Sequence, residues 1–238
     1  YVNNYRGLKY GDMWECPDIF NVDGQDILIM SPERTNKDGY PSHGRITTIN
    51  FDHENCKLEI TGPLNYLDYG LDLYAPQSTI DEDGRRIYVA WMRMPAPDDE
   101  NWIGLITYPR IITYRNNHIY SDIHPNVDNL FVSETNDFNN EIACKITTKL
   151  DIGDYLNIGG YQISFDGKLN IDRSLVYNYD AGLKQLSSPK LDKCELKIFY
   201  DQHIIEIYIN NGEYVLSNIV YNLSNDINSN TNFTIYKK

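Results

Sequence analysis

The chain has 238 residues, of which 41% are hydrophobic and 23% are charged, and its net charge is −13 at pH 7. These proportions are ordinary for a globular protein, and the length allows one large β domain or two ordinary ones. Because nucleic acids and anionic membrane surfaces are polyanions, the acidic balance argues against both as partners.

Targeting and redox signals are few. No apolar run reaches the length of a membrane span, and no signal peptide is visible, although the chain begins with Tyr rather than Met and its natural start is expected upstream. The four cysteines lie far apart without a Cys-x-x-Cys pair: Cys16, Cys56, Cys144 and Cys194. We therefore expect reduced thiols, no metal site and a cytoplasmic protein, while secretion stays open because the natural N-terminus is not visible.

The first stretch that suggests chemistry is residues 11–20, Gly-Asp-Met-Trp-Glu-Cys-Pro-Asp-Ile-Phe. It places the carboxyl of Glu15 between the indole of Trp14 and a Cys-Pro pair, just before a predicted strand. A bulky apolar neighbour disfavours the charged form of a carboxyl, as a general acid working near neutral pH requires. Taken alone, such a block more often marks a surface glutamate at the start of a strand.

Turn dipeptides predict an all-β chain. Asp-Gly and Asn-Gly pairs supply the positive φ that tight hairpin turns demand. They occur at residues 23–24, 38–39, 83–84, 166–167 and 211–212. Most of them separate β-type runs, and no segment sustains a helical period.

A second block, residues 68–77, reads Asp-Tyr-Gly-Leu-Asp-Leu-Tyr-Ala-Pro-Gln. On an alternating strand, Asp72 and Tyr74 share one face and can both project toward a pocket. The alternative is that Asp72 caps a turn and Tyr74 packs in the core. Downstream, Trp91 lies in an apolar strand and is expected to pack in the core. Trp102 follows an acidic stretch and is expected at a rim, where an indole can stack on a sugar face.

The apolar pattern lapses over residues 115–130, which predicts a boundary between two parts of the chain. Short strands with motif-bearing loops precede it, and longer, more regular strands follow. Residues 205–209 alternate with a period of two, and residues 214–220 return after the Asn-Gly turn, which predicts a hairpin. Residues 222–232, rich in Asn and Ser, predict a loop before a final strand at 233–236.

In order and spacing these blocks resemble glycoside hydrolase family 32, the invertases, sucrose-6-phosphate hydrolases and fructanases. The most specific blocks are Met-Trp-Glu-Cys-Pro-Asp at 13–18 and Tyr-Ala-Pro-Gln at 74–77. Leu73 stands where the family usually has Phe, and Arg110 matches a Pro-Arg pair and is expected to form a structural ion pair. The resemblance covers essentially the whole chain.

The resemblance implies a fold, because family 32 enzymes consist of a five-bladed β-propeller followed by a β-sandwich. Residues 1–115 are then expected to form the later propeller blades, residues 116–130 a linker, and residues 131–238 the C-terminal β-sandwich.

The resemblance also implies an activity. Glu15 is expected to be the general acid/base of a retaining glycosidase that cleaves terminal β-D-fructofuranosides without a cofactor. The implied partner is a small carbohydrate, either sucrose or sucrose 6-phosphate, and a fructan is the nearest alternative. The candidate substrate-binding residues are Trp14, Asp72, Tyr74 and Trp102.

One half of such a site is absent from the sequence. A retaining glycosidase needs two carboxyls about 5 Å apart, an acid/base and a nucleophile. The family's nucleophile lies in an Asn-Asp-Pro-Asn-Gly block and its transition-state stabiliser in an Arg-Asp-Pro block, and neither block occurs here. The chain is therefore expected to be catalytically incomplete alone, with a missing N-terminal part of the same protein as a partner. The alternative from another class is a non-catalytic carbohydrate-binding or structural β protein derived from the family.

Overall fold

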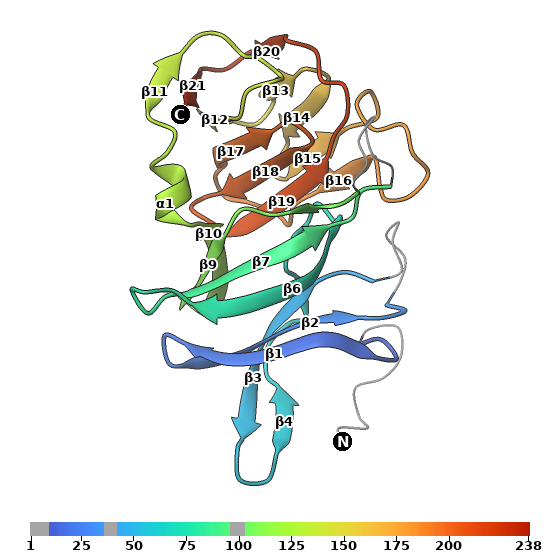
Figure 1. The fold of residues 1–238 in the computed structure, drawn as a ribbon, viewed down its shortest axis with the longest axis vertical. Coiled ribbons are helices and arrows are strands. Elements are labelled where there is room, and N and C mark those ends of the chain that lie inside the picture. The colour runs from blue at the N-terminus through green and yellow to red at the C-terminus, as the bar shows by residue number, and fades with distance from the viewer. Residues whose placement is uncertain (1–9, 36–41, 96–102) are drawn as a thin grey trace.

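The computed structural model describes residues 10–35, 42–95 and 103–238. Two small blade sheets, built from the first half of the described chain, lie below a two-sheet sandwich built from the second half (Figure 1). The fold is all-β, which confirms the prediction of propeller blades followed by a β-sandwich. No helix in these ranges is long and apolar enough to cross a bilayer.

The first blade sheet has antiparallel neighbours in the order β1-β2-β3-β4, and a short β5 pairs with β3. Its strands are β1 (Trp14–Val22), β2 (Gln25–Pro32), β3 (Arg45–Asp52), β4 (Lys57–Ile60) and β5 (Asn65–Tyr66). The predicted turn between β1 and β2 is confirmed, since Asp23 and Gly24 both have positive φ. The turn predicted at 38–39 lies outside the described residues.

The second blade sheet has the order β10-β9-β7-β6, and a short β8 pairs with β7. Its strands are β6 (Leu73–Ile80), β7 (Arg86–Met92), β8 (Leu105–Ile106), β9 (Arg110–Arg115) and β10 (His118–Ile123). β10 lies inside the segment 116–130 that the sequence predicts as a linker, and it pairs with β9 along its whole length. The change from blades to sandwich therefore comes after β10, where the four-residue α1 (Pro125–Asp128) follows.

The sandwich consists of a six-stranded sheet, ordered β11-β21-β12-β17-β18-β19, and a five-stranded sheet, ordered β16-β15-β14-β13-β20. The six-stranded sheet contains β11 (Ser133–Thr135), β12 (Cys144–Lys149), β17 (Glu195–Asp201), β18 (Ile204–Ile209), β19 (Tyr214–Ile219) and β21 (Phe233–Lys237). The five-stranded sheet contains β13 (Tyr155–Ile158), β14 (Tyr161–Phe165), β15 (Leu169–Asp172), β16 (Gln185–Ser187) and β20 (Ile227–Ser229). The predicted hairpin is confirmed as β18 and β19, whereas β20 falls inside the predicted loop 222–232.

Burial follows the strand period in the sandwich. Alternate residues of β14 are buried and exposed, because one face fills the core between the two sheets and the other faces solvent. In β18 every residue is buried, since one face joins that core and the other packs on the blades. Sandwich and blades thus share a continuous buried interface. All four cysteines are free.

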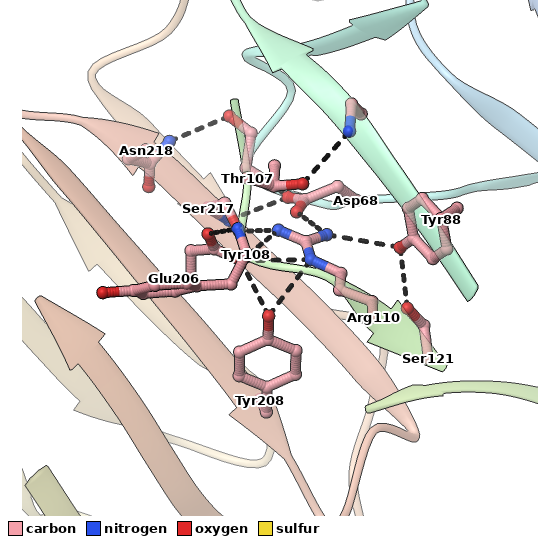
Figure 2. A network of polar contacts seen from close by, with 12 residues as sticks. Asp68, Tyr88, Thr107, Tyr108, Arg110, Ser121, Glu206, Tyr208, Ser217 and Asn218 are labelled. Carbon is pink, nitrogen blue, oxygen red and sulfur yellow. Dashed lines mark hydrogen bonds and ion pairs between the residues drawn. The ribbon is translucent and has the colours of Figure 1, made fainter. Parts of the chain in front are cut away.

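A buried guanidinium joins the two parts (Figure 2). Arg110 of β9 donates from Nη1 to Asp68 Oδ2 at 2.8 Å and from Nη2 to Glu206 Oε2 of β18 at 2.7 Å. All three side chains are buried from solvent. Burial disfavours the positive charge, but Tyr208, Glu206 and the other groups around it raise the pKa of Arg110 well above its usual value. The predicted structural ion pair of Arg110 is confirmed.

Candidate active site

Two of the predicted site residues meet where the facing strands β1 and β6 begin. The hydroxyl of Tyr74 donates a hydrogen bond to Oε2 of Glu15, across 59 positions of sequence. Both side chains are half-buried, so the carboxyl is held by the protein and still open to a ligand. The structure therefore places a carboxyl and a phenol together at the junction of the two blade sheets.

The two strands present these side chains through matching β-bulges. In β1 the register shifts between Glu15 and Asp18, and in β6 it shifts between Tyr74 and Gln77. In each bulge the residue just before a proline has positive φ: Cys16 at 46° and Ala75 at 48°. Such backbone costs about 1–3 kcal/mol and persists only where the surroundings determine it. The bulges thus turn Glu15 and Tyr74, which follow the first residue of β1 and β6 respectively, toward each other.

A hydrogen bond ties the β6 bulge to β2, the strand that pairs with β1. The backbone N–H of Ala75 donates to Oγ of Ser31 at 3.1 Å. Ser31 is fully buried, and it is also the cross-strand neighbour of Glu15 on β2. The position of Tyr74 is thus tied to the position of Glu15 through β2, as well as through the phenol itself.

Arg93 fixes the aromatic ring of Tyr74. Its guanidinium carbon lies 5.1 Å from the ring centroid, and its Nη1 and Nη2 donate to the backbone oxygens of Ser42 and Leu71 at 2.7 and 3.0 Å. Burial, followed by the hydrogen bond to Glu15, raises the pKa of Tyr74 to about 12. The phenol therefore stays protonated at neutral pH and remains a hydrogen-bond donor to Glu15.

Trp91, which the sequence predicts in the core, is 41% exposed. It is the cross-strand partner of Tyr74, and the two rings lie edge to face with centroids 6.4 Å apart. Gly104, with φ of +88°, passes so close that a Cβ there would lie 2.2 Å from the indole Nε1. The indole is therefore held in place beside Tyr74, and part of its surface is open to solvent.

Trp14 and Asp72 lie elsewhere. The indole of Trp14 packs with Leu28 and Met30, and its Nε1 donates to the backbone oxygen of Tyr10 at 2.7 Å. Because neighbouring strand residues point to opposite faces, this cluster lies on the far side of β1 from the carboxyl. Asp72 is fully buried and forms a two-pronged ion pair with Arg173 of the sandwich.

The remaining candidate, Trp102, lies outside the described residues. In the part of the chain that the structure describes, no three His, Cys, Asp or Glu side chains form a group that could hold a metal ion. What the arrangement offers is the positioned carboxyl of Glu15, a neutral phenol donor and a partly exposed indole. This set can transfer a proton beside a flat apolar surface, as acid/base work on a sugar requires.

Replacing Tyr74 with Phe tests the importance of the phenol. The ring and its contact with Arg93 stay, whereas the hydrogen bond to Glu15 is lost. A hydrogen bond to a charged group contributes about 1.5–3 kcal/mol. If sucrose is the substrate, as the sequence predicts, kcat/KM for sucrose should therefore fall roughly ten- to a hundredfold. Steady-state kinetics would measure this. Tyr114→Phe, which removes an exposed hydroxyl bonded to Asn117, is the matched control and should leave kcat/KM unchanged.

Comparisons with known proteins cover the whole described fold. Residues 2–122 match the family model of the glycosyl hydrolases family 32 N-terminal domain, and residues 126–238 match that of the family 32 C-terminal domain. The chain is 30% identical to a sucrose-6-phosphate hydrolase of Bacillus subtilis, over 90% of this chain and 50% of that protein. A sucrose-6-phosphate hydrolase of Escherichia coli is also 30% identical, over 88% of this chain and 50% of that protein.

Solved structures share the fold. The structure of a sucrose-6-phosphate hydrolase from Lactobacillus gasseri superposes with a TM-score of 0.84 at 21% identity, over 100% of this chain and 57% of that one. A β-fructofuranosidase of Bombyx mori, solved as a mutant in complex with sucrose, has a TM-score of 0.75 at 20% identity, over 98% of this chain and 55% of that one. The chain thus spans about half the length of the curated relatives that it matches.

Proposed function

Since the chain belongs to glycosyl hydrolase family 32, we propose that it carries the acid/base half of a retaining β-fructofuranosidase site, with Glu15 as the acid/base. The observation that carries the proposal is the Glu15 carboxyl held by the Tyr74 phenol at the junction of two matching bulges. A general acid/base must be held in one position and must also reach the substrate, and a half-buried carboxyl meets both needs.

The proposed reaction has two steps. In the first, Glu15 protonates the leaving glycosidic oxygen while a second carboxylate attacks the fructosyl carbon and forms a covalent intermediate. In the second, the Glu15 carboxylate takes a proton from water as the water oxygen bonds to the fructosyl carbon, which breaks the bond to the second carboxylate and releases fructose. Because neither nucleophile block occurs in the sequence, the proposal assigns the second carboxylate to no residue of this chain.

The proposed substrate is a terminal β-D-fructofuranoside, either sucrose or sucrose 6-phosphate. Support comes from the names of the relatives, several of which are sucrose-6-phosphate hydrolases, and from the Bombyx mori structure in complex with sucrose. The partly exposed indole of Trp91, which packs against Tyr74, offers a surface on which a sugar ring can stack. The free thiols agree with the proposed cytoplasmic location.

Fructose release from sucrose and from sucrose 6-phosphate tests the proposal. The polypeptide should be purified from its source cells, so that any segment outside the 238 residues is present, and assayed beside the 238-residue chain. We expect the natural polypeptide to release fructose with retained configuration, as followed by NMR, and the shorter chain to release none. If the natural polypeptide binds these sugars but releases no fructose, the non-catalytic carbohydrate-binding alternative holds instead.

A further inference from the structure

The five-stranded sheet of the sandwich has a hollow on its outer face. The hollow has a volume of about 700 Å³ and is lined by residues of β13, β14, β15, β16 and β20. The other sandwich sheet, through β18 and β19, faces the blades, so the hollow lies in a different layer from Glu15. Nothing in the proposed hydrolysis uses it.

Strand register arranges the outward side chains of this sheet in two rows. The longer row crosses all five strands, because Asn228 pairs with Asn157, Asn157 with Gln162, Gln162 with Asp172, and Asp172 with Gln185. Neighbouring strands lie about 4.8 Å apart, so this row is roughly 19 Å long. The shorter row crosses four strands beside it and consists of Tyr155, Ser164, Asn170 and Ser187.

The chemistry of the two rows is nearly uniform. Of the nine outward side chains, five are amides, three carry a hydroxyl and one is the carboxylate Asp172. The described lining includes no lysine, arginine or histidine. An outer face that only kept the sheet soluble would be expected to carry charges of both signs. Amides and hydroxyls both donate and accept, which matches the neighbouring hydroxyls of a sugar.

Hydrogen bonds within the two rows already hold some of these side chains in position. Gln185 Nε2 donates to Asp172 Oδ2 at 2.8 Å, and Ser187 Oγ donates to Asn170 Oδ1 at 2.7 Å. By contrast, the structure gives the side chain of Gln162, at the middle of the longer row, no hydrogen-bond partner among the described residues. Groups placed on a rigid sheet bind with less loss of conformational entropy than groups on a loop.

We propose that this hollow is a second carbohydrate-binding site, which takes a neutral oligosaccharide chain laid along the longer row. The absence of cations in the lining disfavours a phosphorylated ligand. Tyr155, 45% exposed at one end of the shorter row, offers its ring for stacking on a sugar. The row is long enough for several sugar units, whereas a monosaccharide would contact only a part of it. The site goes beyond the proposed hydrolysis and does not depend on it.

Titration of the 238-residue chain with neutral oligosaccharides tests the site. The probes are 1-kestose and linear inulin, xylan, cellulose and starch oligosaccharides of four units, observed through backbone amide NMR shifts. We expect at least one probe to shift amides of β13, β14 and β15. The affinity for that probe should fall about fivefold or more in Gln162→Ala, the size of one lost hydrogen bond of about 1 kcal/mol.

Controls separate this site from the candidate active site. Glu134→Ala alters an exposed strand residue on β11 of the other sheet and should leave the affinity unchanged. Glu15→Gln should also leave it unchanged, so failure of the proposed hydrolysis would not affect the result. The proposal is overturned if no probe shifts the five-stranded sheet, if shifts appear only around β1 and β6, or if Gln162→Ala binds as tightly as the unaltered chain.

Discussion

Replacing Glu15 with Gln should lower kcat for sucrose by a factor of about 10²–10⁴ in the natural polypeptide, the range that general acid/base catalysis contributes. The amide has nearly the shape of the carboxyl, and its oxygen can still accept the hydrogen bond of Tyr74. It can neither protonate the leaving oxygen nor take a proton from water. The loss should therefore appear in kcat while the fold, followed by circular dichroism, stays unchanged.

The leaving group gives this test a sharper form. In an activated aryl fructoside, the aryl oxide can leave without being protonated. On such a substrate, the first step catalysed by Glu15→Gln should therefore be much less impaired than on sucrose. Glu59→Gln, which alters an exposed carboxyl on β4, is the matched control and should keep full activity. If Glu15→Gln hydrolysed sucrose at the unaltered rate, the assignment of Glu15 would be wrong.

The residues of the candidate site could be predicted from the sequence, but the contact between them could not. The blocks around Glu15 and Tyr74 singled out both residues, but no pattern in either block said that they touch. Contact depends on the two bulges, in each of which one extra residue re-aims the strand. The visible signal was a proline two residues after each side chain, at Pro17 and Pro76.

The partner of Asp72 and the exposure of Trp91 could not be predicted from the sequence for a different reason. Asp72 shares a block with Tyr74, yet its carboxylate binds Arg173, 101 residues away. Trp91 sits in an apolar run typical of a buried strand, but its exposure depends on where the β8 segment passes. Both outcomes are set by packing between elements, which local periodicity does not record.

The turn between β9 and β10 lies in the segment whose composition predicted a boundary. The Arg-Asn-Asn-His stretch at 115–118 has the polar composition of a linker. In the structure Asn116 and Asn117 both have positive φ and form the two-residue turn between β9 and β10. Asparagine tolerates that conformation well, so an Asn-Asn pair indicated a hairpin as much as a break.

Arg110→Met should lower the free energy of unfolding by about 3–5 kcal/mol, the usual cost of breaking a buried ion pair from one side. Methionine fills much of the space but leaves Asp68 and Glu206 facing each other without their shared guanidinium. At roughly 2–4 °C per kcal/mol for a chain of this size, Tm should fall by about 10 °C, as measured by calorimetry.

Arg115→Met, at the exposed end of the same strand, is the matched control and should change the free energy of unfolding by less than about 0.5 kcal/mol. A double-mutant cycle with Glu206→Gln measures the coupling between the two side chains, which are joined by hydrogen bonds of 2.7 and 3.1 Å. Because Arg110 lies on β9 and Glu206 on β18, a large coupling energy would mean that blades and sandwich unfold as one cooperative unit. If Arg110→Met cost no more than Arg115→Met, the buried cluster would not hold the two parts together.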